Sequence, residues 1–506
     1  MTNTLDELRL GSLIGTKRLK LACGLKQFPE EILLLAATLE VLDLSDNQLT
    51  ELPDSIAQLK HLKIIFFENN NFITFPKALS KCPLLSMIGF KSNQIETVPE
   101  NAFPPLLKWL ILTNNKIRKI PKSIGSCLLL QKCTIAGNLI EELPSEMANC
   151  VNLELLRISA NKLKSIPQWL FELPKLSWVA FGGNPAAYRI QIKTDFESFQ
   201  WTDFTIKELL GEGASGLISK AHWKLTKEDV ALKVFKGNMT SDGLPEDEME
   251  VSMAAGSHAS LIEVLGKIKE HPEEKSGLIM KLISPSFINL GNPPSLETCT
   301  RDVFDENCIF STKELLKIAK SIASVCSQLH SKGINHGDLY AHNILVNKTA
   351  DCLLGDFGAA SFYDVNSLEA HNIERVEVRA FGCLVADVLN LVPKNEVDKQ
   401  LLHKWQKLIT DCTISNVKFR PSFGEVIEEL DILVRVLLSI ERNFDCDQMF
   451  SFWDIRSHIR AHMGVRGNLA FSRRLVLATG RNGDGQQDKK NKQVCDTFHG
   501  VLPRTE

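Results

Sequence analysis

An asparagine recurs at nearly constant intervals through the first part of this chain. The positions are Asn47, Asn70, Asn93, Asn115, Asn138, Asn161 and Asn184, which are spaced by 23, 23, 22, 23, 23 and 23 residues. A proline follows six residues after each of the first six asparagines, at Pro53, Pro76, Pro99, Pro121, Pro144 and Pro167. Ordinary core periodicity does not keep such a phase over so many residues. The spacing therefore predicts an array of structural repeats.

Leucines keep a fixed register to these asparagines. Around Asn47 they stand at Leu39, Leu42, Leu44 and Leu49. This pattern resembles leucine-rich repeats, in which each repeat supplies a short strand and stacked repeats bury one another's leucines. The resemblance implies that the repeat asparagines satisfy backbone groups at each turn. We expect an α/β leucine-rich repeat solenoid with an N-terminal cap over residues 1–190.

The outward positions of the repeat strands should line a concave sheet. Their charges are mixed, and two of them are apolar. Such a surface suits a protein or peptide ligand better than a nucleic acid, which favours a basic stripe. The alternative is that the face is only solvated and the solenoid is a scaffold. The positions are Asp43, Ser45, Phe66, Glu68, Lys91, Ile111, Thr113, Thr134, Arg157 and Ser159.

Composition narrows the compartment and the partners. The formal net charge of −3 provides no overall field that would attract nucleic acid or an anionic membrane. The first 21 residues carry too many charges for a signal peptide, and no apolar run is long enough for a transmembrane helix. The 13 cysteines include no Cys-x-x-Cys pair, so we expect reduced thiols. Together these features predict a cytoplasmic protein without a transmembrane segment.

The second half of the chain contains acids and an amide at informative spacings. Asp338 and Asn343 are five residues apart in the stretch His-Gly-Asp-Leu-Tyr-Ala-His-Asn, and Asp356 opens Asp-Phe-Gly thirteen residues after Asn343. One acid can accept the proton of an attacking hydroxyl. The amide and the second acid are hard oxygen ligands of the kind that Mg²⁺ prefers. This set is what metal-dependent phosphoryl transfer requires.

A glycine-rich segment precedes this set. Gly211 to Ile218 reads Gly-Glu-Gly-Ala-Ser-Gly-Leu-Ile, and a Val-Ala-Leu-Lys strand follows and ends at Lys233. Glycines allow a loop to close over phosphates and present backbone N–H groups to them. A dinucleotide-binding fingerprint is the alternative, but it requires a helix directly afterwards. Residues 218–223 instead have the pattern of a second strand.

Taken in order, these motifs resemble the eukaryotic-type protein kinase fold, an α+β bilobal architecture. The resemblance covers residues 204–438. It implies a linker over residues 191–203 and a C-terminal tail, partly disordered, over residues 439–506, in which residues 450–462 have an amphipathic helical pattern.

The resemblance also implies roles for individual residues. Asp338 would be the catalytic base, Lys233 would hold the phosphates of ATP, and Asn343 and Asp356 would bind Mg²⁺. Glu248 would form the ion pair with Lys233, although Glu250 is an open alternative. The residues expected to bind ATP are Gly211, Glu212, Gly213, Ala214, Ser215, Gly216, Leu217, Ile218, Ala231, Lys233, Met280, Leu282 and Leu345.

Three residues in the segment from His336 to Asn343, which we call the catalytic stretch, depart from the family pattern. Gly337 stands where the family usually has an arginine that binds a phosphate on the activation loop, which implies activity independent of that phosphate. Tyr340 stands where serine/threonine kinases carry a lysine, and His342 where some tyrosine kinases carry an arginine. The preferred hydroxyl therefore stays open. Only 18 residues separate Gly358 from Glu377, so the activation segment is short.

The short segment lacks the Ala-Pro-Glu of the family, and Glu374 could pair with Arg420 in its place. The sequence thus predicts an ATP- and Mg²⁺-dependent protein kinase that phosphorylates serine or threonine, with the repeats recruiting a protein partner or regulating the kinase. One alternative is a catalytically weak pseudokinase scaffold. Another is a small-molecule kinase of the aminoglycoside or choline type, although such enzymes generally lack the glycine loop, Val-Ala-Leu-Lys and Asp-Phe-Gly that this chain has.

Overall fold

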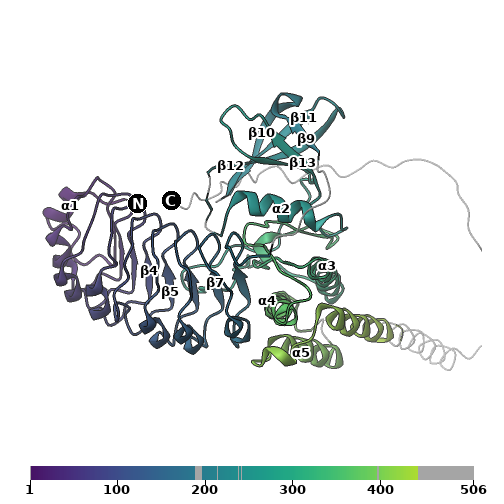
Figure 1. Ribbon diagram of the computed structural model, residues 1–506. Coiled ribbons are helices and arrows are strands. Elements are labelled where there is room, and N and C mark those ends of the chain that lie inside the picture. The colour runs from purple at the N-terminus through teal and green to yellow at the C-terminus, as the bar shows by residue number, and fades with distance from the viewer. Residues whose placement is uncertain are drawn as a thin grey trace, which may run out of the picture. The chain divides into compact units, whose positions relative to one another are not determined.

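The computed structural model describes residues 2–188, 197–213, 215–237, 239–240, 242–395, 398–440 and 442. Residues 1–441 form one compact unit, in which a repeat solenoid is followed by a two-lobed domain (Figure 1). The tail from residue 443 onwards, with the helix expected over residues 450–462, lies outside the described residues. Ala214 of the glycine-rich segment lies outside them as well.

The solenoid forms one parallel sheet whose strands follow sequence order, as the repeat spacing predicts. The central residue of each strand is buried, so its two neighbours face the opposite, concave side. The strands are β1 (Arg18–Lys20), β2 (Val41–Asp43), β3 (Ile64–Phe66), β4 (Met87–Gly89), β5 (Trp109–Ile111), β6 (Lys132–Thr134), β7 (Leu155–Arg157) and β8 (Trp178–Ala180).

The buried repeat asparagines hold successive repeats together. Asn70 accepts a hydrogen bond from the Leu49 backbone N–H through Oδ1, at 2.9 Å, and donates from Nδ2 to the Leu44 carbonyl, at 2.9 Å. The same pattern recurs at each later repeat asparagine, through Asn184. Each asparagine therefore pairs buried backbone groups that the short strands leave without partners.

The repeat prolines start short 3₁₀ helices on the other side of the solenoid. A helix follows directly after Pro29, Pro53, Pro76, Pro121, Pro144 and Pro167, whose φ angles lie between −65° and −71°. These helices are η1 (Glu30–Leu35), η2 (Asp54–Gln58), η3 (Lys77–Lys81), η4 (Lys122–Ser126), η5 (Ser145–Asn149) and η6 (Gln168–Glu172). The helix α1 (Leu5–Arg9) precedes the first repeat and buries Leu8.

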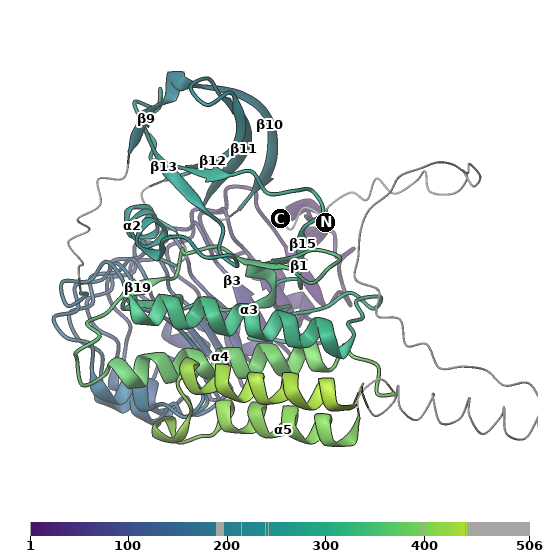
Figure 2. The same ribbon diagram turned by 90° about the vertical axis from the view of Figure 1, so that its right-hand side faces the viewer.

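The upper lobe is a mixed sheet with one helix below it (Figure 2). The strand order is β10-β11-β12-β14-β13-β9, antiparallel except for the β13–β9 pair. Its elements are β9 (Ser198–Gln200), η7 (Trp201–Asp203), β10 (Phe204–Glu212), β11 (Gly216–Trp223), β12 (Glu228–Phe235), α2 (Pro245–Ala255), β13 (Val264–Lys269) and β14 (Gly277–Lys281). The glycine-rich segment comprises the end of β10, the connection between the two strands and the start of β11.

The lower lobe is mainly helical, with α3, α4 and α5 lying one above another (Figure 2). The helices are η8 (Ala341–Asn343), α3 (Thr312–Ser331), α4 (Ala370–Leu389), α5 (Lys399–Thr413), η9 (Val417–Phe419) and a further helical stretch, 423–440. The strands are β15 (Ile288–Asn289), β16 (Ile334–Asn335), β17 (Ile344–Val346), β18 (Cys352–Leu354) and β19 (Ser361–Phe362). Among the described residues, no helix combines the length and apolar character needed to cross a bilayer.

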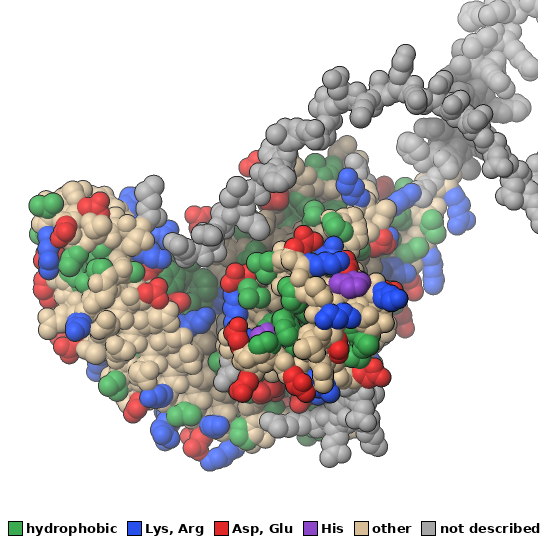
Figure 3. Space-filling view, turned by 90° about the horizontal axis from the view of Figure 1, so that it is seen from above, with side chains coloured by type: hydrophobic (Ala, Val, Ile, Leu, Met, Phe, Trp, Pro, Cys, Tyr) green, Lys and Arg blue, Asp and Glu red, His purple; other side chains and the backbone are tan. Residues whose placement is uncertain are grey.

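The last repeats of the solenoid pack into the lower lobe. Ile373 and Val376 of α4 belong to the hydrophobic core of the solenoid, and Leu155 and Trp178 of the solenoid belong to the core of the lobe. Asn335 also donates a hydrogen bond to the carbonyl of Val179 in β8, at 2.9 Å. The two regions therefore share buried surface. On the face shown in Figure 3, acidic and basic side chains are interspersed.

The expected pair between Glu374 and Arg420 is wrong. Arg420 is buried and donates to three carbonyl oxygens, including that of Pro174 in the solenoid, at 2.7 Å. Glu374 instead accepts a hydrogen bond from the backbone N–H of Phe423, at 2.8 Å. Three carbonyls already satisfy the guanidinium, and one of them comes from the solenoid.

Candidate active site

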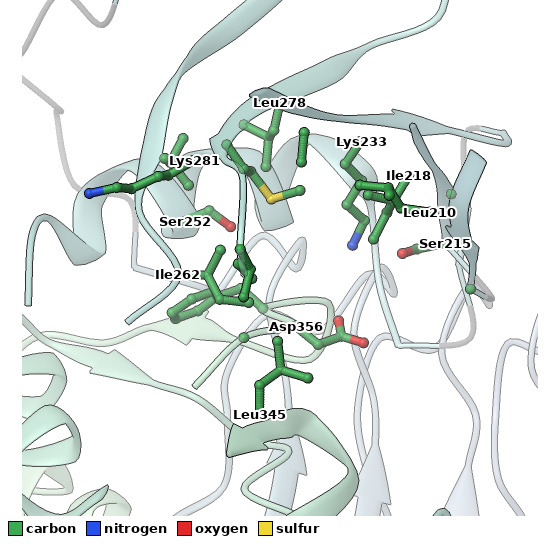
Figure 4. A pocket seen from close by; sticks show the side chains of 18 of the residues that line it. Leu210, Ser215, Ile218, Lys233, Ser252, Ile262, Leu278, Lys281, Leu345 and Asp356 are labelled. Carbon is green, nitrogen blue, oxygen red and sulfur yellow. The ribbon is translucent and has the colours of Figure 1, made fainter. Parts of the chain in front are cut away.

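A cavity of about 480 Å³ lies between the two lobes, within the usual range of small-molecule sites. Side chains from β10, β11, β12 and β14 line it from above, and Leu345 lines it from below (Figure 4). The residues expected to bind ATP or metal that line this cavity are Gly213, Ser215, Gly216, Ile218, Ala231, Lys233, Met280, Leu282, Leu345 and Asp356. The walls also include Leu210, Ile262, Val264 and Leu278, which the sequence analysis did not single out.

Three residues expected at the nucleotide do not line this cavity: Gly211, Glu212 and Leu217. Leu217 alternates with Gly216 and Ile218 along β11, so its side chain faces away from the side that they line. Glu212 forms an ion pair with Lys236, at 2.5 Å, on the exposed side of the loop. A local motif identifies the loop, but only every second residue of its strands faces the cavity.

Lys233 is held in the cavity by Glu248 of α2. The two side chains form a buried ion pair, and this contact decides between Glu248 and Glu250. Burial, with a smaller contribution from the nearby Asp356, raises the pKa of Glu248 to about 7 despite the opposing effect of Lys233. The ammonium of Lys233 and the carboxylate of Asp356 both point into the same part of the cavity (Figure 4).

Gly337 is the point at which the solenoid meets the catalytic stretch. Its φ of 73° lies in the left-handed region, which glycine adopts without strain. A Cβ atom at this position would lie 2.5 Å from the carbonyl oxygen of Val179 and 2.7 Å from that of Ala359. An arginine could not replace it without moving the solenoid backbone. The packing of the solenoid thus explains the departure from the family pattern.

Asp338 has partners on two sides. Asn343 donates from Nδ2 to the Asp338 carboxylate at Oδ2, at 2.8 Å, and to the Asp338 carbonyl, at 2.9 Å. On the other side Arg157, from β7 of the solenoid, forms an ion pair with Asp338 Oδ1. The Arg157 side chain also donates to the Gly337 carbonyl, at 3.0 Å, and to Asp242, at 2.7 Å.

Arg157 is only 2% exposed. Burial lowers its pKa, but the charges of Asp338 and Asp242 outweigh this effect and raise the pKa above its ordinary value. The repeat pattern places Arg157 on the concave face. Nothing in the sequence indicates that Arg157 contacts Asp338, because the two residues are 181 positions apart. The solenoid therefore supplies a charged side chain to the catalytic stretch.

A second solenoid residue fixes Tyr340. Trp178 stacks on the Tyr340 ring, with centroids 4.3 Å apart and planes 9° apart, and its Nε1 donates to the Leu339 carbonyl, at 3.0 Å. On the far side of Tyr340, His342 is bound to Asp302, at 2.7 Å. Tyr340 therefore contacts the rings of both Trp178 and His342.

Glu377 supports the catalytic stretch from below. It is fully buried and accepts hydrogen bonds from the backbone N–H groups of His336, at 3.1 Å, and Gly337, at 2.7 Å. Burial raises the pKa of Glu377, but the bond to His330, at 2.7 Å, outweighs this effect and keeps the pKa below its ordinary value. In the sequence, Glu377 marks only the end of the short activation segment. A buried carboxylate facing two backbone donors leaves no sequence pattern that could have revealed it.

The polar groups beside the cavity fit a nucleotide with its metal ion. Asp356 has a φ of 56°, and its Oδ1 accepts only a 3.2 Å bond from the Gly358 N–H among the described residues. Within the described part of the chain, no three His, Cys, Asp or Glu residues cluster as a complete metal site. One carboxylate and one amide are enough for Mg²⁺, which takes its remaining ligands from phosphates and water. Asp356 and Asn343 are the residues that could hold the ion.

Comparisons with known proteins agree with this architecture. A family model described as protein tyrosine and serine/threonine kinase matches residues 204–380, and a leucine rich repeat model matches residues 37–95. The chain is 25% identical over 273 residues to fibroblast growth factor receptor 1 of Pleurodeles waltl, covering 45% of the chain and 33% of the receptor. It is 30% identical over 267 residues to a probable serine/threonine-protein kinase of Dictyostelium discoideum, covering 45% of the chain and 16% of that protein.

A second probable serine/threonine-protein kinase of the same organism is 24% identical over 260 residues, covering 44% of the chain and 40% of the relative. The chain therefore spans two fifths or less of the length of these curated relatives. The chain carries a leucine-rich repeat region followed by a protein kinase domain.

Proposed function

We propose that this protein is an ATP- and Mg²⁺-dependent protein kinase that phosphorylates serine or threonine. One observation carries the proposal. Lys233, which is paired with Glu248, lines one cavity together with Asp356, and Asp338, which is paired with Asn343, lines a second cavity that shares Asp242 with the first. These are the charges and ligands that phosphoryl transfer requires.

Each residue has a distinct task in the proposed reaction. Lys233 binds the α- and β-phosphates of ATP, and Glu248 keeps its ammonium in place. Asn343 and Asp356 hold Mg²⁺, which when bound neutralises charge on the phosphates. The acceptor hydroxyl oxygen forms a bond to the γ-phosphorus, its proton passes to the carboxylate of Asp338, and the bond to the β,γ-bridging oxygen breaks. ADP leaves with the electron pair of that bond.

The choice of serine or threonine is supported by the relatives. Two of them are named probable serine/threonine-protein kinases, although the family model includes tyrosine kinases as well. Tyr340, in place of the usual lysine, leaves the γ-phosphate without that cation. Among the described residues, Arg157 forms an ion pair with Asp338. We propose that Arg157 supplies positive charge beside Asp338 in place of the usual lysine.

A catalytically weak scaffold is the second candidate, and one observation favours it. Arg157 and Asn343 together occupy both carboxylate oxygens of Asp338. A carboxylate oxygen has two lone pairs, however, so each can still accept a further hydrogen bond from a hydroxyl. The intact Lys233–Glu248 pair favours the kinase.

We further propose that the repeats bind a protein partner and that the protein works in the cytoplasm. The mixed charges of the concave face support a protein or peptide ligand. The cysteines of the described residues are all free thiols, and most of them are buried. Such thiols are typical of proteins in a reducing compartment.

The test is phosphate transfer from labelled ATP with Mg²⁺, onto the protein itself and onto generic protein acceptors. Wild type is compared with Asp338→Asn, which keeps the shape of the side chain but cannot take a proton. We expect labelled phosphoserine or phosphothreonine with wild type and a loss of about 10²–10⁴-fold with the variant. If wild type transfers nothing while ATP still raises its melting temperature, the scaffold replaces the kinase. If the label appears only on an added metabolite, the small-molecule kinase replaces it.

A further inference from the structure

A second cavity, of about 350 Å³, lies between the solenoid and the catalytic stretch. Its solenoid wall includes Trp109, Lys132 and Arg157, and its kinase wall includes Asp338, Tyr340 and His342. Neither region encloses this space alone. It is therefore a site that exists only because the last repeats pack into the lower lobe.

This second cavity adjoins the nucleotide cavity. Asp242 lines both of them, and Asp338, the proposed base, lines the second. A group bound in the second cavity would therefore face the phosphate end of the nucleotide, where Lys233 and Asp356 lie. Its position makes it the acceptor side of the proposed reaction, in which the hydroxyl must contact Asp338.

Three residues that line this cavity carry buried side-chain polar atoms without a hydrogen bond in the described part of the chain. Within the described residues, Trp109 Nε1, Thr134 Oγ1 and Tyr340 OH are buried without a hydrogen bond. A buried polar group without a partner costs about 1–3 kcal/mol, so such groups are rarely left without one. All three groups can donate a hydrogen bond, so a ligand that supplies acceptor oxygens would satisfy them.

Lys132 adds a cation to the same wall. Its Nζ lies 4.1 Å from the centroid of the Trp109 ring, and no carboxylate among the described residues lies within ion-pair distance of it. Burial, and then the charge of Arg157, lowers the pKa of Lys132. An anionic group placed against Lys132 would reverse this effect and would gain a partly desolvated ion pair.

The cavity is elongated along the concave sheet. Its solenoid residues come from five consecutive repeats, from Glu68, just after β3, to Arg157 in β7. Neighbouring strands are about 4.8 Å apart, so four steps cover about 19 Å, the length of about six residues of extended peptide. A compact metabolite would leave most of this length empty. The dimensions therefore favour a peptide segment.

We propose that this cavity is the acceptor site and that it binds an extended peptide with an aspartate or glutamate beside the serine or threonine to be phosphorylated. The carboxylate of that residue is bound by Lys132 and the Nε1 of Trp109, and the hydroxyl lies at Asp338. The repeats are thus part of the substrate site itself. The transfer step rests on the proposed function, whereas the peptide-binding step does not.

The binding step is tested by fluorescence anisotropy with labelled serine peptides in which one flanking position at a time is aspartate, or asparagine in the matched set. The full chain is used as wild type, Lys132→Ala, Lys132→Met and Arg18→Ala. Arg18 is the matched control, because it occupies the same register position as Lys132 at the far end of the sheet, in β1. Lys132→Met keeps the aliphatic stem over Trp109 in case the alanine variant does not fold.

We expect one aspartate position to tighten binding about tenfold in wild type and in Arg18→Ala, and to have no effect in either Lys132 variant. Equal binding of the aspartate and asparagine sets in wild type would overturn the proposal, as would an aspartate effect that survives in Lys132→Met. Phosphate transfer onto the same peptides is measured separately. Peptide binding that depends on Lys132 without any transfer would contradict the kinase and leave the binding site standing. Transfer without an aspartate preference would contradict this site and leave the kinase standing.

Discussion

The two cavities of this molecule are built in different ways. The nucleotide cavity is lined only by residues 210–358, all of which belong to the kinase region. The second cavity is lined by residues from both the solenoid and the catalytic stretch, between positions 68 and 342. The first is a site that the kinase region provides alone. The second depends on how the two regions pack, because the solenoid supplies one of its walls.

The largest expected effect comes from Trp178, which joins the two regions. The side chain is 2% exposed, stacks on Tyr340 and donates a hydrogen bond to the Leu339 carbonyl. We expect Trp178→Ala to lower the free energy of unfolding by about 3–5 kcal/mol, measured by chemical denaturation. The control is Phe103→Ala, a partly buried aromatic residue of the solenoid that packs on Phe75, with a smaller loss. Equal losses would mean that the two regions do not depend on each other.

The nucleotide cavity could be predicted largely from the sequence, and the second cavity could not. Lys233 and Asp356 stand in short motifs whose spacing alone indicates their chemistry. Arg157 stands in no such motif. The repeat pattern predicts that its side chain faces the concave side of the sheet, but it does not indicate whether another part of the chain packs against that side. Its partner Asp338 is 181 residues away, and nothing local in the sequence specifies that distance.

The fold shows the same division. The repeat spacing predicts the strand positions and the hydrogen bonds of the repeat asparagines. Proline geometry predicts where the 3₁₀ helices start. The packing of the last repeats on α4 does not follow from local sequence. The expected pairing of Glu374 with Arg420 is wrong because Arg420 donates to backbone carbonyls, including that of Pro174 in the solenoid. One clue was present. Gly337 in place of the usual arginine marks the spot where the backbone of Val179 approaches too closely for any side chain.

The next effect concerns the nucleotide cavity alone. Lys233→Met removes the cation that the buried carboxylate of Glu248 holds in place. We expect phosphate transfer to fall by about 10²–10³-fold, because the charge on the phosphates is then not stabilised in the transition state. Peptide binding in the second cavity should be unchanged, as measured by anisotropy with the serine peptides. A parallel loss of peptide binding would show that the two cavities are not independent.

A smaller effect is expected from pH. The pKa of Glu248 is raised to about 7, so its proton is bound more tightly in the folded chain than in the unfolded chain, whose value is near 4.5. The contribution of Glu248 to the free energy of unfolding therefore falls as the pH rises from about 4.5 to about 7. Its carboxylate is fully charged, and its ion pair with Lys233 is complete, only above about pH 7. We expect kcat/KM for ATP to rise about tenfold between about pH 6 and about pH 8.

The matched control for the pH effect is Glu248→Gln, which cannot titrate. Its kcat/KM should be lower throughout, and the part of the pH profile that belongs to Glu248 should be absent. Any titration of the nucleotide itself remains in both proteins and is subtracted by this comparison. A profile that is identical in wild type and Glu248→Gln would contradict the role given to this pair.

The smallest effect on stability is expected from Tyr340→Phe. The ring keeps its stack on Trp178, and the hydroxyl has no hydrogen-bond partner among the described residues. We expect an unchanged or slightly higher free energy of unfolding, because removing a buried unpaired hydroxyl relieves a cost. Binding of the aspartate peptides should weaken. A clear loss of stability would mean that the hydroxyl has a structural partner and that it is not free for a ligand.

The most direct test of the composite site is a double-mutant cycle between the solenoid and the catalytic stretch. The free energy of unfolding is measured for wild type, Arg157→Ala, Asp338→Asn and the double variant. Because the two side chains form a buried ion pair, we predict a coupling energy of about 1–3 kcal/mol. Lys164→Ala, which removes an exposed ion pair with Glu141, is the control and should show no coupling to Asp338→Asn. A coupling energy near zero for Arg157 and Asp338 would show that the solenoid does not contact the catalytic stretch, and would contradict the account.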